Sequence, residues 1–343
     1  MVERMVSHYR IIDKVGEGGM GVVYRAHDTL LQRTVALNFI SSTRLSSEKS
    51  REHFYREARA AAALEHENIC SIHDIAESDG ATFIVMAFCD GPTLRDMINE
   101  APLPLEKAVP VIKDVARGLG CAHGKGIIHR DIKPSNIIVD PGRRQARIMD
   151  FGLAKTLGPG DEGTSTTRAG TIEYVSPEQI ENVSVDWRTD IWSLGVTFFE
   201  TLTGKRPFKG QYQASVIYSI LNEEPDMSGI PPGPEGELAA DIIARSLSKA
   251  PEDRYPDIDS FIADLERLER KLSTNGGTEL PARPKRSPPW YSVRPLFILV
   301  ILAVALPVVL WFDSLDERRP SPAGIYAGGG TDSLRSEADM MFE

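Results

Sequence analysis

Cysteine is scarce in this chain and forms no recognisable motif. The 343 residues include three cysteines, Cys70, Cys89 and Cys121. Their spacing is not of the CxxC type, so neither a disulfide framework nor a zinc site is indicated. A reducing compartment is therefore expected. The length suits one large domain or two closely packed domains, with further segments at the ends.

Basic segments are scarce as well. The formal net charge is −10, and the first 270 residues contain no long block of lysine and arginine. Because surfaces that bind nucleic acid are positively charged, we expect no nucleic-acid partner. Met1–Met5 is not followed by the apolar run of a secretory signal, so the N-terminus is not interpreted as one.

One long apolar run is present near the other end of the chain. Residues 295–312 read PLFILVILAVALPVVLWF, without a charged or amide side chain, and predict a short membrane-spanning helix. A buried helix or the apolar edge of a further domain is the alternative. Residues 271–294 form a basic, proline-rich linker, whereas residues 313–343 mix both signs of charge with Gly and Ser.

This charge asymmetry predicts an orientation in the membrane. The positive-inside rule places residues 1–294 in the cytoplasm and residues 313–343 outside. The outer segment has too little apolar content to fold alone, so it is expected to be disordered. The sequence thus predicts a single-pass protein of the cell membrane.

The pattern of apolar residues predicts an α+β fold with a small β-rich lobe followed by a larger helical lobe. Strands are expected at residues 9–15, 22–27 and 34–40. Helices are expected at residues 48–65, 105–124, 190–202, 239–247 and 259–272. In the first helix Phe54, Ala58, Ala61 and Leu64 form an inward stripe. Residues 88–92 connect the lobes.

A glycine-rich segment lies between the first two expected strands. Residues 16–23 read GEGGMGVV, with glycines at Gly16, Gly18, Gly19 and Gly21. Such spacing lets backbone N–H groups approach phosphate oxygens, although a hairpin turn alone would explain it. A dinucleotide-binding fold requires a helix after the glycines. Here a strand is expected, which argues against that fold.

The strongest chemical signal is residues 129–136, HRDIKPSN, followed by Asp150-Phe151-Gly152. Asp131 can orient a hydroxyl group and accept its proton, and Lys133 can neutralise charge on a moving phosphoryl group. Asn136 and Asp150 offer oxygen ligands of the kind that Mg²⁺ prefers. Any one of these residues alone would pass for a charged surface loop. Their fixed spacing indicates phosphoryl transfer.

On these motifs the chain resembles the protein-kinase family, from about His8 to Leu268. HRDIKPSN, with Lys133, is the serine/threonine form of the family's loop, and Ser176-Pro177-Glu178 stands where the family has Ala-Pro-Glu. The arrangement is most similar to bacterial membrane-anchored kinases. The resemblance implies a bilobal kinase domain over residues 8–270, with lobes at about 8–88 and 89–270. It also implies ATP, and Mg²⁺ with Mn²⁺ as an alternative, as cofactors.

The resemblance also implies roles for individual residues. Asp131 would be the catalytic base, Asn136 and Asp150 the metal ligands, and Glu57 the helix glutamate. The segment from Gly16 to Val23 would cover ATP. The adenine contacts would be the side chains of Val15, Val23, Ala36 and Ile138, the gatekeeper Met86, and the backbone of Ala87 and Cys89.

The segment between Asp150 and Glu178 separates this chain from small-molecule phosphotransferases, which lack it. It contains Thr164-Ser165-Thr166-Thr167 and Gly170-Thr171. The family resemblance implies that Thr171 helps to seat a serine or threonine substrate. Phosphate on Thr166 or Thr167 would be captured by Arg130 and would order the loop. An unmodified polar loop is the alternative. Asp190 and the pair Glu178 and Arg254 would have scaffold roles.

Asn38 departs from the family pattern. Residues 35–38 read VALN, where relatives have a lysine that joins the ATP phosphates to the helix glutamate. Asparagine is too short and uncharged to do this. A lost charge-assisted hydrogen bond costs about 1.5–3 kcal/mol, which lowers the rate at least about ten- to a hundredfold. No lysine stands in the glycine segment to replace it.

Two hypotheses follow. The chain is either a serine/threonine protein kinase slowed by Asn38, or a pseudokinase that binds nucleotide or a partner and signals by conformation. The completeness of the other motifs favours the first hypothesis, and the missing lysine favours the second. Protein substrates are the expected partners, together with a second copy of the chain for trans-autophosphorylation.

Overall fold

The computed structural model describes residues 5–18, 21–41, 45, 47–142, 145–151 and 172–275. The chain divides into two compact units, residues 1–278 and 279–343, and the second unit lies outside the described residues. Within the described ranges no helix is both long and apolar enough to cross a membrane. The predicted span at 295–312 and the tail at 313–343 are outside those ranges.

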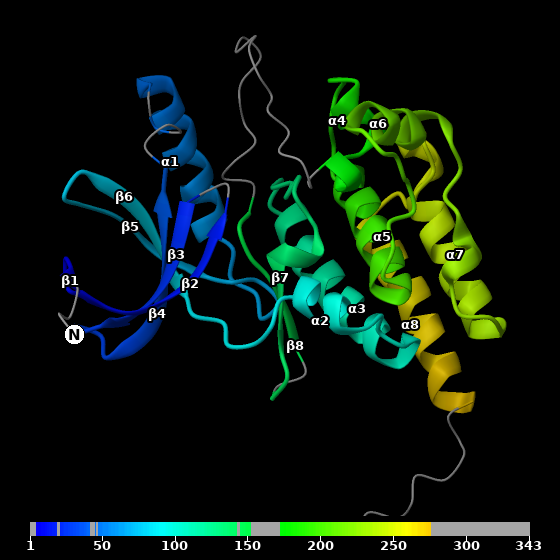
Figure 1. Ribbon diagram of the computed structural model, residues 1–343, viewed down its shortest axis with the longest axis horizontal. Helices are drawn as coiled ribbons and strands as arrows, with labels where there is room; N and C mark the ends of the chain where they lie inside the picture. Colours follow the sequence, from blue (N-terminus) through cyan, green and yellow to red (C-terminus); the bar gives the residue numbers. More distant parts are fainter. Residues whose placement is uncertain are drawn as a thin grey trace, which may run out of the picture. The chain divides into compact units, whose positions relative to one another are not determined.

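The first lobe is built on an antiparallel sheet of six strands in the order β1-β2-β3-β4-β6-β5 (Figure 1). The strands are Met5–Val6 (β1), Tyr9–Gly18 (β2), Gly21–Asp28 (β3), Arg33–Ile40 (β4), Ile72–Ser78 (β5) and Ala81–Ala87 (β6). The middle of β4 and β6 is fully buried, with Leu37, Phe83 and Val85 at 0% exposure. These β-branched and aromatic residues favour a pleated, half-buried surface, which explains why they form strands.

One helix, α1 (Glu48–Ala62), accompanies this sheet. Ser47 caps its N-terminus by accepting a hydrogen bond from the backbone N–H of Ser50 at 3.1 Å, which satisfies one of the free donors of the first turn. Its inward stripe of Phe54, Ala58 and Ala61, continued by Leu64 just after the helix, is buried as predicted.

The second lobe is mainly helical. Its α-helices are Leu94–Glu100 (α2), Leu105–His123 (α3), Pro177–Ile180 (α4), Arg188–Thr203 (α5), Gln213–Asn222 (α6), Pro234–Ser246 (α7) and Ile258–Asn275 (α8). A short hairpin of Ile137–Asp140 (β7) and Gln145–Ile148 (β8) precedes the segment containing Asp150. Helix α5 is buried along nearly its whole length, so it forms the centre of this lobe.

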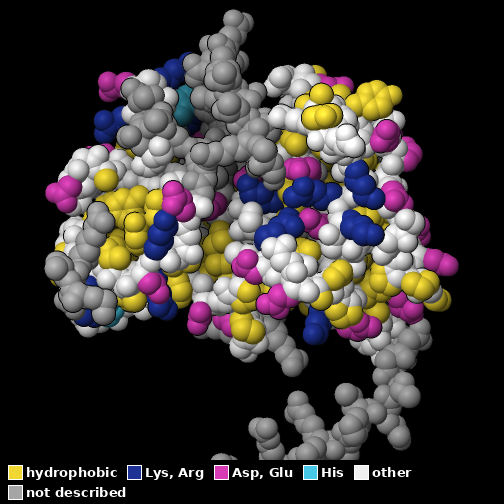
Figure 2. Space-filling view, in the orientation of Figure 1, with side chains coloured by type: hydrophobic (Ala, Val, Ile, Leu, Met, Phe, Trp, Pro, Cys, Tyr) yellow, Lys and Arg dark blue, Asp and Glu magenta, His cyan; other side chains and the backbone are white. Residues whose placement is uncertain are grey.

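The surface of this lobe carries both signs of charge. Figure 2 shows basic side chains beside acidic ones on the viewed face of the helices. The ion pairs of the lobe include Arg95 with Glu200 at 2.8 Å and Arg206 with Glu173 at 2.6 Å. Because Glu200 belongs to α5, its ion pair with Arg95 joins the lobe surface to the central helix.

The predicted α+β fold with a β-rich first lobe and a helical second lobe is confirmed. Residues 88–92 do connect β6 to α2, as expected. Helix α8 continues to Asn275, into the first residues of the predicted linker. Helices α2 and α6 and the β7–β8 hairpin were not predicted, because they are short and lack a long apolar period.

Candidate active site

Asp131 lies in the loop between α3 and β7 and is held from two sides. It is 5% exposed. The Lys133 ammonium lies 2.8 Å from Asp131 Oδ2. Asn136 Nδ2 donates to the same oxygen at 3.1 Å and to the Asp131 carbonyl at 2.9 Å. The structure thus brings together the predicted base, the predicted phosphoryl-neutralising lysine and one predicted metal ligand.

Asp190 of α5 supports this loop from the core. Its carboxylate accepts hydrogen bonds from the backbone N–H of His129 at 2.8 Å and of Arg130 at 2.7 Å. Arg130 has a φ of 65°, a left-handed conformation that is costly for a residue with a side chain. These hydrogen bonds stabilise that conformation. Asp190 is therefore a positioning residue, as the predicted scaffold role implied.

Asp150 lies close to the same group of side chains. Burial raises its pKa and the Asp131 carboxylate raises it further, while Lys133 and a side-chain hydrogen bond from Asn38 lower it. Two neighbouring carboxylates in a partly dry site favour a bound cation. Among the described residues, no group of three or more His, Cys, Asp or Glu side chains is arranged to hold a metal.

Asn136 and Asp150 are the two donors that the sequence predicted for a divalent cation at this site. An amide oxygen from Asn136 and the Asp150 carboxylate are donors that suit Mg²⁺, which usually keeps several water or phosphate ligands. Asn136 is 7% exposed. Its amide nitrogen donates a hydrogen bond to Asp131, so its amide oxygen points away from Asp131. The residues present fit a magnesium–phosphate complex.

Asn38 lies in β4 and is 3% exposed. Its side chain forms the hydrogen bond to Asp150, while its Oδ1 atom has no hydrogen-bond partner among the described residues. Burying an amide oxygen without a partner is costly. The position where the family resemblance implies a lysine thus holds a neutral amide that contacts the predicted metal ligand.

Glu57 of α1 is half-buried, and its electrostatic surroundings differ from the family expectation. Burial raises its pKa, and the largest opposing effect comes from the charge of Arg130, followed by Arg56 and His53. The principal positive charge acting on Glu57 is therefore the arginine that was predicted to capture a phosphate.

Part of the predicted adenine site is assembled in the structure. Ala36 and Met86 are paired across β4 and β6 and are 8% and 6% exposed. Val23 packs against the same apolar cluster. Val15, in contrast, is 56% exposed, and Ile138 pairs with Thr93 across an isolated bridge. The described contacts do not place Val15 or Ile138 in the cluster with Met86.

The glycine segment forms a hairpin in which Gly18 pairs with Gly21. At Gly21 φ is 148°, and an added Cβ would lie 1.5 Å from the Phe39 carbonyl oxygen. No other residue fits there without moving β4. At Gly16, by contrast, a Cβ would meet nothing within 4 Å, so the steric requirement for glycine is at Gly21. Gly19, Thr166, Thr167 and Thr171 lie outside the described residues.

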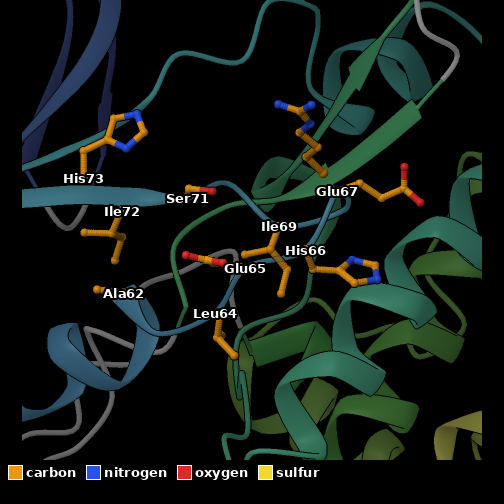
Figure 3. Close-up of a pocket in the computed structure, with 10 residues that line it drawn as sticks. Ala62, Leu64, Glu65, His66, Glu67, Ile69, Ser71, Ile72 and His73 are labelled. Atoms are coloured by element: carbon orange, nitrogen blue, oxygen red, sulfur yellow. The ribbon is translucent and has the colours of Figure 1, made fainter. Parts of the chain in front are cut away.

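A cavity of about 540 Å³ lies where the loop after α1 meets β8 (Figure 3). Ile69, Ser71 and His73 line one part of it, and Arg147 of β8 lines another. Sequence reasoning missed this cavity, because its lining residues carry no motif and meet only in the folded chain. It also missed the contact between Cys70 and Cys89 close to it, since cysteines nineteen positions apart match no known spacing.

The comparisons with known proteins agree with the fold. The family profile described as "Protein kinase domain" matches residues 9–263. The chain is 36% identical over 303 residues to "Serine/threonine-protein kinase pkn3" of Myxococcus xanthus, covering 81% of this chain and 55% of that protein. It is 38% identical over 292 residues to "Serine/threonine-protein kinase PknB" of Mycobacterium tuberculosis, covering 81% and 44%.

The solved structures show the same fold. A crystal structure of a double mutant of the Mycobacterium tuberculosis PknI kinase domain aligns with a TM-score of 0.62 at 24% identity, covering 78% of this chain and 98% of that one. The chain belongs to the protein kinase family. The resemblance to bacterial serine/threonine kinases inferred from the motifs is confirmed. The chain spans about half the length of the curated relatives that it matches.

Proposed function

We propose that this protein is a serine/threonine protein kinase that transfers the γ-phosphate of ATP to hydroxyl groups of protein substrates. The observation that carries the proposal is the fixed Asp131 carboxylate, held by Lys133 and Asn136 beside Asp150. The names of the similar bacterial proteins support the choice of serine and threonine as acceptors.

The residues divide the work of the reaction. Asp131 orients the acceptor hydroxyl and takes its proton, and Lys133 neutralises charge that develops on the phosphoryl group. Asn136 and Asp150 would hold Mg²⁺, or Mn²⁺ in its place, and such an ion neutralises the β- and γ-phosphates. The segment from Gly16 to Val23 would lie over the phosphates, and the apolar cluster around Met86 would receive the adenine.

Regulation would involve Arg130. In the proposed active state, phosphate on Thr166 or Thr167 pairs with Arg130. In the structure described above, the charge of Arg130 lowers the pKa of Glu57. A second copy of the chain would supply that phosphate. Incubating native chain with an Asp131→Asn chain carrying a size tag tests transfer between copies, since label on the tagged chain can only come from the native one.

We also propose that residues 295–312 anchor the protein in the cell membrane, with the kinase domain in the cytoplasm. The support is the uncharged apolar run and the basic segment that precedes it. The full chain should then sediment with membranes after a high-salt wash and be released by detergent. Recovery of the full chain in the soluble fraction without detergent would contradict the proposal.

The Asn38→Lys variant should transfer phosphate about ten- to a hundredfold faster than the native chain. The added ammonium would reach Glu57 and the ATP phosphates, and one charge-assisted hydrogen bond is worth about 1.5–3 kcal/mol. Transfer from radiolabelled ATP to a generic protein substrate, followed by phosphoamino-acid analysis, measures the change. Asn38→Met, of similar length to lysine but uncharged, is the matched control and should give no gain.

The same assay separates the proposed enzyme from the alternative, a pseudokinase that binds nucleotide or a partner. Asn38, with its contact to Asp150, is the observation that favours the alternative. If the native chain labels nothing above an Asp131→Asn background while Asn38→Lys does, the native chain is a pseudokinase. ATP binding without transfer in either chain would favour a scaffold role.

A further inference from the structure

Two of the three cysteines meet where the lobes are joined. Cys70 belongs to the loop between α1 and β5, and Cys89 follows β6 in the connecting segment. Their Sγ atoms are 2.7 Å apart. Both thiols are free. Cys70 is 8% exposed, so a pair of reduced thiols is largely enclosed by protein.

The backbone around the pair is fixed by hydrogen bonds. The N–H of Cys70 donates to the carbonyl of Ile148 at 2.9 Å, and the N–H of Ala87 donates to the carbonyl of Ser71 at 2.9 Å. These bonds join the Cys70 loop to β8 on one side and to the end of β6 on the other. The two sulfur atoms are therefore held in contact by three segments, and bond formation between them needs no large movement of the chain.

The surroundings shift the pKa values of the two thiols in opposite directions. The hydrogen bond between the two thiols and the nearby Arg147 guanidinium lower the pKa of Cys89, against the effect of its burial. Arg147 Nη1 lies 3.9 Å from Cys89 Sγ. The pKa of Cys70 is raised by its hydrogen bond to Cys89 and by burial. Cys89 is thus the more acidic of the two thiols and the one suited to attack as a thiolate.

The cavity shown in Figure 3 lies beside the chain segment that carries Cys70. The cavity is lined by Ile69 and Ser71, the two neighbours of Cys70 in the chain, and by Arg147, which contacts Cys89. Neither cysteine is among the residues that line this cavity, and Cys89 is the partly exposed member of the pair, so a reagent would meet Cys89 first. Redox-sensitive cysteines combine an accessible, acidic thiol with a nearby resolving thiol, and here Cys89 is the partly exposed thiol and Cys70 the buried one.

The pair also adjoins the predicted adenine site. Cys70 Sγ lies 3.3 Å from the carbonyl oxygen of Ala87, and Cys89 Sγ lies 3.9 Å from the same atom. The backbone of Ala87 and Cys89 is the part of the chain expected to bond the adenine edge. A chemical change at either sulfur therefore alters the polar groups that the base would meet.

We propose that Cys70 and Cys89 form a peroxide-sensitive dithiol site, whose oxidation to a disulfide weakens ATP binding at the adjacent adenine end. The regulatory half of this proposal rests on the function proposed above. Cys89 thiolate attacks a peroxide oxygen, the O–O bond breaks, and Cys89 sulfenic acid and water form after proton uptake. The Cys70 sulfur then attacks the Cys89 sulfur and releases a second water. Hydrogen peroxide is reduced, and the two thiols are oxidised.

Binding of ATP and oxidation are then coupled in both directions. The disulfide removes both thiol hydrogens from beside the Ala87 carbonyl and fixes Cys89 against the neighbouring loop. Coupling between two such events is typically about 5–150-fold in affinity. Because coupling is reciprocal, saturating ATP should favour the dithiol over the disulfide by the same factor in a glutathione redox titration.

The test uses the full chain in detergent, reduced and then treated with hydrogen peroxide. Peptide mass mapping should find a Cys70–Cys89 disulfide, and ATP affinity measured by calorimetry should fall at least about fivefold. Dithiothreitol should restore it. In Cys70→Ser the reaction should stop at Cys89 sulfenic acid, which dimedone traps, whereas Cys89→Ser should give no trapped Cys70. Cys121→Ser, the matched control, should oxidise like the native chain.

The outcomes separate this inference from the proposed function. A chain that transfers phosphate but forms no Cys70–Cys89 disulfide at peroxide levels that trap Cys89 overturns the inference alone. Unchanged ATP affinity in the fully oxidised chain overturns its regulatory half. If the reduced chain binds no ATP, the proposed function fails, and the disulfide map alone decides whether the dithiol site is real.

Discussion

Asp131→Asn should lower phosphoryl transfer by about 10²–10⁴-fold, the usual contribution of a general base. Asparagine retains the shape of the side chain and its contact with Asn136, but it cannot accept the proton of the substrate hydroxyl. The Lys133 ammonium, now 2.8 Å from the carboxylate, also loses its counter-charge. The initial rate of transfer from ATP to a protein substrate is the measurement. It should be made in the Asn38→Lys background, where the higher signal widens the range.

A control for this prediction should remove an aspartate without touching the loop. Asp226 lies 3.4 Å from Lys209 in an exposed ion pair, so Asp226→Asn removes the same kind of contact elsewhere. Its transfer rate and melting temperature should match the parent chain. If Asp131→Asn keeps more than about a tenth of the parent rate, proton acceptance by Asp131 is not required. An unchanged ATP affinity in Asp131→Asn would show that only the chemical step is affected.

The catalytic loop could be predicted because its chemistry is local in the sequence. Asp131, Lys133 and Asn136 stand within six residues of one another, so their spacing alone places them on one loop. The contacts among them agree with that prediction. The inward stripe of α1 could be predicted for a similar reason, because helical periodicity needs only local spacing.

Contacts between distant segments could not be predicted from these patterns. Cys70 and Cys89 meet because β5 and β6 pair and bring their flanking loops together. The influence of Arg130 on Glu57 requires the relative position of α1 and the catalytic loop. Neither contact can be predicted from the spacing of residues in the sequence.

Asn38 shows how the two kinds of information combine. The sequence identified the missing lysine, but the structure adds the contact of Asn38 with Asp150 and an amide oxygen without a partner. Two features accompany the missing charge. The largest positive charge acting on the pKa of Glu57 is that of Arg130, and the Asn38 amide contacts the predicted metal ligand Asp150. The Asn38→Lys variant should change both, which is why its effect is expected on the rate and not only on nucleotide affinity.

Arg254→Gln should destabilise the fold by about 3–5 kcal/mol, because it leaves a buried carboxylate without its partner. The Arg254 guanidinium forms two hydrogen bonds of 2.8 Å to the two oxygens of Glu178. It also donates to three backbone carbonyls, those of Ser248, Arg188 and Lys249. The Arg254 side chain is fully buried and that of Glu178 is 5% exposed. The pair thus ties α4 to the segments around α5 and α8.

The expected fall in stability corresponds to a melting temperature lower by about 6–20 °C for a domain of this size, measured by calorimetry or circular dichroism. The pH dependence gives a second test. Burial raises the pKa of Glu178, but the hydrogen bonds and charge of Arg254 outweigh it and hold the pKa below its ordinary value of 4.5. The contribution of the pair is therefore complete above pH 4.5 and is lost as the pH falls through the lower, folded-state pKa.

An exposed pair provides the control. Arg117 lies 3.4 Å from Glu266, and both side chains are more than 40% exposed, so Arg117→Gln should cost no more than about 1 kcal/mol. The double variant Glu178→Gln with Arg254→Gln should recover part of the loss, because no buried charge then remains unpaired. If Arg254→Gln melts within about 2 °C of the native chain, the buried pair is not a main support of the large lobe. An acid sensitivity that persists unchanged in the double variant would mean that other carboxylates cause it.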